Sequence, residues 1–468
     1  MIGESSTPLA ASAGNATVAR FSNSRLLALA GVFHLAVTTL VFALGRANIF
    51  PGLFNKDGIG AFAPDSPVYL EHVVTLVHEL KQAGITGWTS APFPLHSKLY
   101  SLSFAAFGPL VGFNILAAEP LNLLCYLTII FSVYKLGNEI SGPRTGRLAA
   151  IIVALWPSLL LHTTQILKDP LFIALLLGVF CLCTYLITRL ISLTRGVGAA
   201  LFGGVLGISL WLLKPDQWAL PLMVIALGAG FQCLRVIRAK RAVAGNLVGS
   251  IALLAIAFGI TLLGPRLISR YRAPDPHPLL TTSRAEVDQA TGVTEPQQNL
   301  RVKPPSRSSP PLTKLRERIA WARYLFVSYP GTTSNIDTEV RLESWREIIR
   351  YLPRATQIGL FAPFPNMWLG TGAQVGRSGR MLSGFETLMS YVFISCSVWS
   401  LWRRRDHLAI WFLLTIATLS VIALGLVAAN IGALYRMRYP FWILLIIVGV
   451  DGARLISSNG KLSRLLRR

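Results

Sequence analysis

The chain has 468 residues, of which 53% are hydrophobic and only 14% charged, and its mean hydropathy is +0.54. This composition excludes an ordinary water-soluble domain and implies a lipid bilayer as the solvent. The formal charge of +23 would suit nucleic acid, but the Lys and Arg residues lie mostly in short clusters between apolar runs. Membrane topology accounts for much of that charge, and no nucleic-acid partner is predicted.

Apolar runs long enough to cross a bilayer recur along the chain. A spanning helix needs roughly 20 mainly apolar residues. The runs predict an all-α integral membrane protein, a polytopic helical bundle of about ten transmembrane helices. The predicted spans are 26–45, 118–136, 148–166, 170–191, 197–213, 217–234, 246–264, 383–402, 408–429 and 439–453.

The first span, 26–45, follows a polar stretch and has no convincing small-residue cleavage site after it. We therefore expect a retained anchor preceded by a cytoplasmic tail, residues 1–25. The 5 cysteines all fall inside or at the edge of apolar runs, which predicts neither a disulfide framework nor a zinc site.

Basic clusters indicate the orientation of the loops. If the N-terminal tail is cytoplasmic, nearly every basic cluster in a short loop lies on the cytoplasmic side, as does the basic C-terminal tail, 454–468. The exception is the short external connection that carries Arg436 and Arg438. The cytoplasmic clusters are Lys135/Arg144/Arg147, Arg189/Arg195, Arg235/Arg238/Lys240/Arg241 and Arg403/Arg404/Arg405.

A further apolar stretch, 99–118, would reverse the side of every later cluster if it crossed the membrane. We therefore predict one external loop, 46–117, which contains an amphipathic helix near 67–84 and an apolar helix, 98–113, at the membrane interface. These elements and the spans to residue 264 would form an N-terminal transmembrane module, 26–264.

A second large external loop is expected over 265–382, before the C-terminal transmembrane helices, 383–453. Its first part, 273–311, is rich in Pro, Ser, Thr and Gln, which predicts disorder. Helical periodicity follows over 312–328 and 338–352. The expected apolar face of the latter helix consists of Leu342, Trp345, Ile349 and Leu352.

Two carboxylates on the external side are candidates for chemistry, because polar groups at membrane depth are costly and tend to be functional. Asp65 lies just before the expected amphipathic helix, and Asp169 precedes Pro170 at the junction of two spans. Each could instead be a helix N-cap. The two roles are compatible.

Candidate phosphate ligands are cations on the same side. Arg436 and Arg438 are predicted on the external side, contrary to the orientation rule that basic residues in short loops lie on the cytoplasmic side. The planar guanidinium suits a phosphate. Both arginines could instead simply anchor a helix at the lipid headgroups. Lys168, next to Asp169, and Lys214, in a tight external turn, could add further positive charge. Alternatively, Lys214 could have no ligand and simply extend its amino group to the membrane interface.

Several features over residues 26 to 220 resemble the GT-C superfamily of glycosyltransferases, which includes protein O-mannosyltransferases and the lipid A aminoarabinose transferase. An early acidic residue in the first external loop and the amphipathic helix are two of them. The others are Pro94-Leu95 and Phe107-Gly108 around an apolar helix, Tyr134 to Gly137, Arg147 to Ala150, Ala154 to Ser158, and Leu210 to Pro221 with Lys214-Pro215-Asp216.

The resemblance implies a polyprenyl-phosphate-linked sugar donor, a glycan, lipid or protein acceptor, surrounding membrane lipids, and an active site on the external face of a bacterial plasma membrane. By it, Asp65 matches the first-loop carboxylate that acts on the acceptor, and Asp169 matches the second-loop carboxylate. Asp169 lacks the paired Asp-x-Asp spacing of the oligosaccharyltransferase branch, which leaves the need for a divalent metal open.

The chemistry is coherent on the residues alone. Attack on a sugar C1 needs a base near the acceptor, here Asp65, and cations near the departing phosphate, here Arg436 and Arg438. No glycine loop follows a strand, so a nucleotide-sugar donor is not indicated. A surface-polysaccharide polymerase or ligase would share the basic external loop. A non-enzymatic transporter of lipid-linked glycans would be favoured by charged residues in mid-span, of which the predicted spans show almost none.

Overall fold

The computed structural model describes residues 9–239, 243–268, 302, 304–306, 308–328, 334–370 and 376–458. Within these ranges the protein is helical, and its only β-structure is a pair of isolated bridges. Nine of the described helices are long and apolar enough to cross a membrane, and the bent pair α5–α6 is a tenth candidate. The prediction of an all-α polytopic membrane protein is confirmed.

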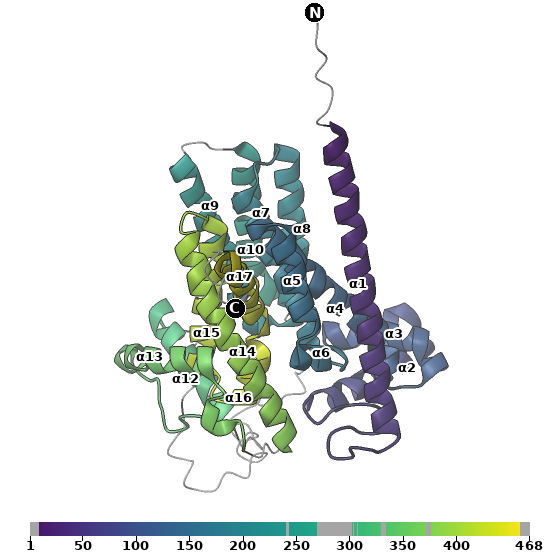
Figure 1. The fold of residues 1–468 in the computed structure, drawn as a ribbon. Coiled ribbons are helices and arrows are strands. Elements are labelled where there is room, and N and C mark those ends of the chain that lie inside the picture. Colours follow the sequence, from purple (N-terminus) through teal and green to yellow (C-terminus); the bar gives the residue numbers. More distant parts are fainter. Residues whose placement is uncertain are drawn as a thin grey trace, which may run out of the picture.

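The long helices form one bundle, drawn in Figure 1. Helices α8 and α10 pack along each other, as do α14 and α17, while α7 contacts α4, α8 and α9 in the interior. The bounds are α1 Leu9–Arg46, α4 Ile115–Ser141, α7 Lys168–Thr188, α8 Leu193–Leu213, α9 Ala219–Ala239, α10 Ala244–Ile268, α14 Gly376–Arg403, α15 Leu408–Val427 and α17 Tyr439–Ser458.

The span expected over 148–166 is not a continuous helix. It is divided into α5, Pro143–Ala154, and α6, Pro157–Thr163, which are bent by 67°. Trp156 precedes Pro157 and has extended backbone angles, φ −70° and ψ 110°. A proline disfavours the helical conformation of the residue before it and cannot donate to the helix, so the chain turns at this point.

The first loop folds into two helices, close to where the sequence predicts them. Helix α2, Ser66–Ser90, has a kink at Gly84, whose φ of 65° is in the left-handed region that favours glycine. Helix α3, Leu95–Val111, packs against α2 and α4 and is not one of the candidate spans. In Figure 1 these helices lie at the same lower end of the bundle as α12, α13 and α16.

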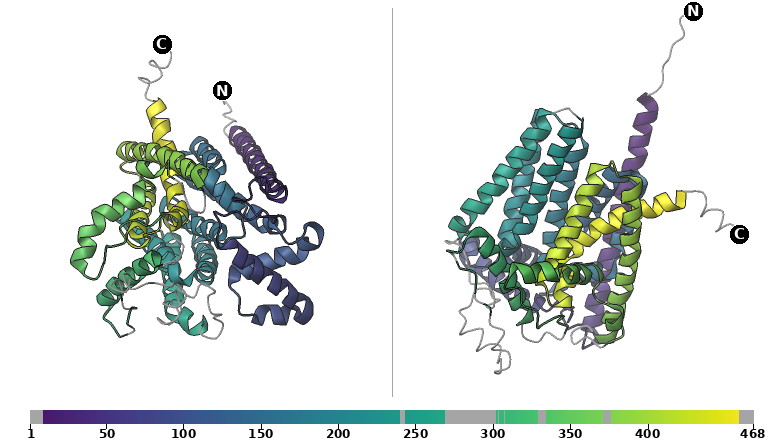
Figure 2. Two further views of the ribbon diagram at one scale, coloured as in Figure 1. Left: turned by 90° about the horizontal axis from the view of Figure 1, so that it is seen from below. Right: turned by 90° about the vertical axis from the view of Figure 1, so that its left-hand side faces the viewer.

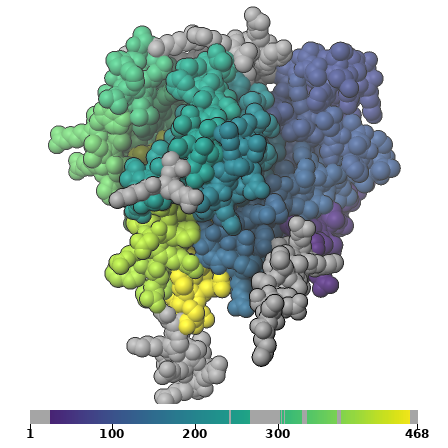
Figure 3. All heavy atoms as spheres, turned by 90° about the horizontal axis from the view of Figure 1, so that it is seen from above, coloured from purple at the N-terminus to yellow at the C-terminus, as the bar shows by residue number. Residues whose placement is uncertain are grey.

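The second loop contributes α12, Pro311–Val327, and α13, Trp345–Phe361. Most of the stretch predicted to be disordered, 273–311, lies outside the described residues. Helix α13 begins later than expected, because Ser344 and Glu347 form a reciprocal capping box at its start. Seen from above, α2–α3 and α12–α13 flank opposite sides of the central helices (Figure 3; Figure 2 gives two further views).

The prediction of which residues form the apolar face of α13 is wrong. Leu342 precedes α13, and Ile349 is 63% exposed. The buried face instead carries Ile348, Tyr351, Ala355, Ile358 and Gly359, and packs on α15. Small residues allow this approach: a Cβ at Gly359 would lie 2.3 Å from the Val421 carbonyl oxygen.

Candidate functional site

Asp65 and Arg436, 371 residues apart in sequence, form an ion pair at the end of the bundle where the loop helices gather. Asp65 occupies the N-cap position of α2, yet its side chain makes no capping hydrogen bond. Its Oδ2 instead accepts a hydrogen bond from Nη1 of Arg436 at 3.0 Å. Arg436 belongs to α16, Ile431–Met437, and the side chains of Arg436 and Asp65 are 20% and 17% exposed. The capping role considered for Asp65 is therefore not what its carboxylate does.

Asp169 forms a separate ion pair, with Lys214. It is the second residue of α7, whose N-cap is Leu167, so Asp169 is not the N-cap. Its Oδ1 accepts a hydrogen bond from Nζ of Lys214 at 2.6 Å, and Lys214 is the C-cap of α8, with its side chain only 6% exposed. The amino group of Lys214 also lies over the ring of Phe172, 4.8 Å from its centre.

Hydrogen bonds tie the segments that carry the two carboxylates to each other. The hydroxyl of Ser66, next to Asp65, donates to the carbonyl of Ile166 at 3.1 Å. The Gly60 amide donates to Oε1 of Gln165 at 2.9 Å. These contacts fix the first loop against the turn that leads into α7, so Asp65 and Asp169 share one neighbourhood.

The electrostatics of the cluster show the same convergence. Burial disfavours the charge on Arg436, but the carboxylates of Asp65 and Asp169 outweigh it and raise the pKa of its guanidinium. Lys168 lies over the ring of Tyr69, 5.9 Å from its centre. Burial raises the pKa of Tyr69 to about 12, opposed by Lys168. Lys168, Lys214 and Arg436 together exceed the two carboxylates by one positive charge, which suits an anionic ligand.

Arg438 does not join this cluster, contrary to what its position two residues from Arg436 suggests. Its side chain is buried, with its guanidinium 3.9 Å from the ring centre of Trp442 and 4.8 Å from that of Tyr435. It donates to the carbonyl of Gly359 at 3.2 Å. Burial lowers the pKa of Arg438 to about 10. The structure therefore brings together Asp65, Asp169, Lys168, Lys214 and Arg436, and separates Arg438 from them.

Sequence reasoning missed His96, the second residue of α3. The imidazole is 2% exposed, stands edge-on to Tyr69 with 4.4 Å between ring centres, and has no hydrogen-bond partner among the described residues. Burial, with Lys168, His72 and Lys214 as further causes, lowers its pKa well below the usual range, so the ring is neutral. Its place after Pro94 at the start of a helix was the only sequence signal.

Two buried carboxylates inside spans were also missed. Glu119 of α4 accepts hydrogen bonds from the Thr38 hydroxyl at 2.8 Å and lies 2.7 Å from Nδ1 of His34. Glu386 of α14 binds Ser158 and Tyr435. Glu119 and Glu386 are the second and fourth residues of the predicted spans 118–136 and 383–402, so the expectation of almost no charge in mid-span is not overturned. Partners distant in sequence compensate each of these carboxylates.

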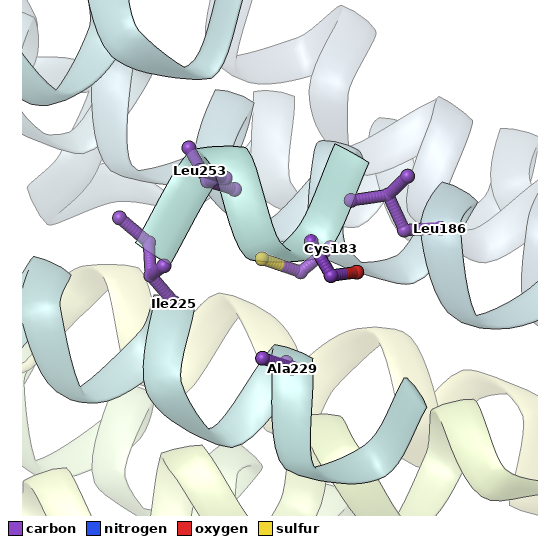
Figure 4. Close-up of a pocket in the computed structure, with 7 residues that line it drawn as sticks. Cys183, Leu186, Ile225, Ala229 and Leu253 are labelled. Atoms are coloured by element: carbon purple, nitrogen blue, oxygen red, sulfur yellow. The ribbon is translucent and has the colours of Figure 1, made fainter. Parts of the chain in front are cut away.

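The cavity drawn in Figure 4 is not a ligand site. It lies between α7, α9 and α10, and its lining is apolar apart from Ser250. Its volume of about 10 Å³ holds roughly one water molecule. Elsewhere in the described part of the chain, no three His, Cys, Asp or Glu side chains converge as a metal site would require.

Comparisons with known proteins give no family for this chain: no family model, no curated protein and no solved structure matches it.

Proposed function

We propose that the protein is a membrane glycosyltransferase that moves a sugar from a polyprenyl-phosphate donor to an acceptor outside the cytoplasm. The observation that carries this proposal is the cluster in which Asp65, at the start of α2, and Asp169, at the start of α7, meet Arg436 and Lys214. It offers a proton acceptor and several cations where the loop helices gather. The polyprenyl chain of the donor can remain in the bilayer while its phosphate reaches the cluster.

The reaction assigns a role to each group. The acceptor oxygen forms a bond to the sugar C1, the bond from C1 to the phosphate oxygen breaks, and the acceptor proton passes to Asp65. Polyprenyl phosphate leaves with the bonding electron pair. Negative charge grows on that phosphate during the reaction, so Arg436, Lys168 and Lys214 would stabilise the transition state.

The resting ion pair implies an exchange of partners. In the free protein the guanidinium of Arg436 holds the carboxylate of Asp65. A donor phosphate would compete for that guanidinium and release the carboxylate to accept a proton. The neutral imidazole of His96 can donate one hydrogen bond and accept another, which suits the hydroxyl groups of a sugar.

Mass analysis of lipid-linked and surface glycans tests this function in cells that lack the gene and carry either the wild-type protein or Asp65→Asn. The proposal expects the polyprenyl-phosphate sugar to accumulate and one sugar to be missing from a surface glycan, both in the empty cells and with Asp65→Asn. The wild-type protein should reverse both changes. Unaltered glycans in the cells without the gene would overturn the proposal.

A transporter of lipid-linked glycans is a second candidate, favoured by the buried pair of His34 and Glu119 inside two spans. It predicts that the donor moves across the membrane without cleavage. Proteoliposomes containing a labelled donor distinguish the two, because only a transferase releases free polyprenyl phosphate when acceptor is added.

A further inference from the structure

Glu386 links three elements through one buried carboxylate. The residue lies on α14 and is 1% exposed. Its Oε1 accepts a hydrogen bond from the backbone N–H of Ser158 at 2.7 Å, and its Oε2 accepts one from the Ser158 hydroxyl at 2.5 Å. The hydroxyl of Tyr435 donates a short hydrogen bond to the same Oε2. An unpaired carboxylate would be costly to bury, and these donors offset that cost.

The two partners of Glu386 lie next to the candidate site. Ser158 is in α6, which runs into the turn that precedes Asp169, and Tyr435 is adjacent in sequence to Arg436. Tyr435 is also held from a second direction, because the Arg438 guanidinium lies over its ring. The ring and hydroxyl of Tyr435 are thus fixed by separate groups, which restricts how α16 can rotate.

We propose that Glu386 is a positioning residue for the anion site: through Tyr435 it holds α16 so that Arg436 reaches Asp65 and the donor phosphate. This inference rests on the proposed function. It also gives Arg438 a role that its burial allows, since Arg438 acts on Tyr435 and not on the phosphate. A carboxylate that only stabilised the bundle would contribute to folding without any effect on phosphate affinity.

Tyr435→Phe is the sharpest variant, because it removes the hydroxyl and keeps the ring on which Arg438 stacks. We expect the affinity for polyprenyl phosphate, titrated into the full chain in lipid nanodiscs, to fall by about 10-fold. The KM for the donor should rise similarly, with the KM for the acceptor unchanged. Ser390→Ala is the matched control: Ser390 is buried on α14, the helix of Glu386, and within the described residues its hydroxyl donates to the backbone carbonyl of Glu386.

A double-mutant cycle with Arg436→Ala separates positioning from a general loss of stability. If Glu386 and Tyr435 act through Arg436, then Tyr435→Phe should not weaken phosphate binding further in the Arg436→Ala background. Glu386→Gln keeps an acceptor for the Ser158 amide and should recover part of the affinity lost in Glu386→Leu. Wild-type phosphate affinity in Tyr435→Phe, or losses that add fully in the double variant, would overturn the inference.

The melting temperatures of the wild type, Tyr435→Phe, Arg436→Ala and the double variant give a readout that needs no substrate. Positioning predicts that Arg436→Ala lowers the melting temperature less in the Tyr435→Phe background, because the Asp65–Arg436 pair is already weakened there. If the wild-type protein neither transfers sugar nor binds polyprenyl phosphate, the proposed function fails. The melting cycle still decides whether Tyr435 positions Arg436: independent effects of the two substitutions would refute it.

Discussion

Arg436 and Arg438 are two residues apart at the end of one short helix, yet their surroundings differ in every respect that matters for binding. Arg436 is 20% exposed and paired with Asp65. Arg438 is 1% exposed, lies against two aromatic rings, and donates a hydrogen bond to the backbone carbonyl of Gly359. Residues two apart on a helix are about 200° apart around its axis, which sends the two side chains to different neighbours.

The contrast shows what makes a cation available to a ligand. A guanidinium paired with a partly exposed carboxylate can exchange that partner for a phosphate and stay paired with an anion. The guanidinium of Arg438 is enclosed by rings and donates to a backbone carbonyl, so it holds no anionic side chain that a phosphate could replace. Position in a loop that breaks the orientation rule is therefore insufficient to identify a phosphate ligand, because both arginines satisfy it.

The largest effect should come from removing the carboxylate that Arg436 holds. Asp65→Asn is expected to lower transfer by about 100-fold or more if Asp65 is the base. The melting temperature should change little, since the Asp65 side chain makes no capping bond and Asn keeps an oxygen for Arg436. A radiolabel transfer assay with purified protein measures the effect. Near-normal transfer would leave Asp65 as a structural partner of Arg436.

The loss of stability should be larger for substitution of Arg438 than for substitution of Arg436, which reverses the order expected for phosphate binding. Arg438→Ala empties the space between Trp442 and Tyr435, and we expect a destabilisation of about 3 kcal/mol, as for large buried side chains. Arg438→Lys should restore little, because an ammonium group cannot stack as a planar guanidinium does. Arg436→Ala should cost much less. Thermal unfolding in detergent compares the three, and equal losses for both alanine variants would contradict the contrast.

A smaller effect is expected at the second ion pair. Lys214→Met removes the ammonium group that donates to the carboxylate of Asp169. Affinity for polyprenyl phosphate should fall by about 10-fold as one cation is lost. Adding Asp169→Asn should recover the melting temperature but not the affinity. If the single variant binds phosphate as the wild type does, Lys214 belongs only to the fold.

The smallest effect concerns His96, which is as buried as Arg438 yet lies among the site residues. His96→Leu should stabilise the protein by about 1 kcal/mol, because the imidazole has no partner among the described residues. The folded pKa of His96 is depressed, so the unfolded chain takes up a proton near pH 6.5 that the folded chain refuses. Stability should then fall by up to about 1.4 kcal/mol per pH unit below 6.5, and His96→Leu should reduce this slope. Melting curves from pH 8 to pH 5 test it, and identical slopes would contradict the assignment.

Much of the architecture could be predicted from hydropathy and charge. The long apolar runs specify the spans, and the basic clusters placed Asp65, Asp169 and Arg436 on one side. Side-chain direction could not be predicted in the short helix α16, where no periodic pattern indicates which arginine faces inward. Glu386 escaped notice because the donors that compensate it, on Ser158 and Tyr435, are 228 and 49 residues away in sequence.

The site was only partly predictable for a similar reason. Pro157 lies inside the span predicted over 148–166, but the break there was not predicted. Its consequence, a short α6 that brings Ser158 to Glu386, depends on how the two halves of the chain pack. The capping roles of Asp65 and Asp169 fitted their local sequence equally well. The ion pairs of these carboxylates with Arg436 and Lys214 depend on tertiary packing and could not be predicted.

The central claim is that Arg436, and not Arg438, receives the donor phosphate. Titration of polyprenyl phosphate into nanodiscs that contain wild-type protein, Arg436→Ala, Arg436→Lys or the control Ser390→Ala tests it directly. The account predicts at least a 10-fold loss of affinity in Arg436→Ala, partial recovery in Arg436→Lys and wild-type affinity in Ser390→Ala. Unchanged affinity in Arg436→Ala would contradict it.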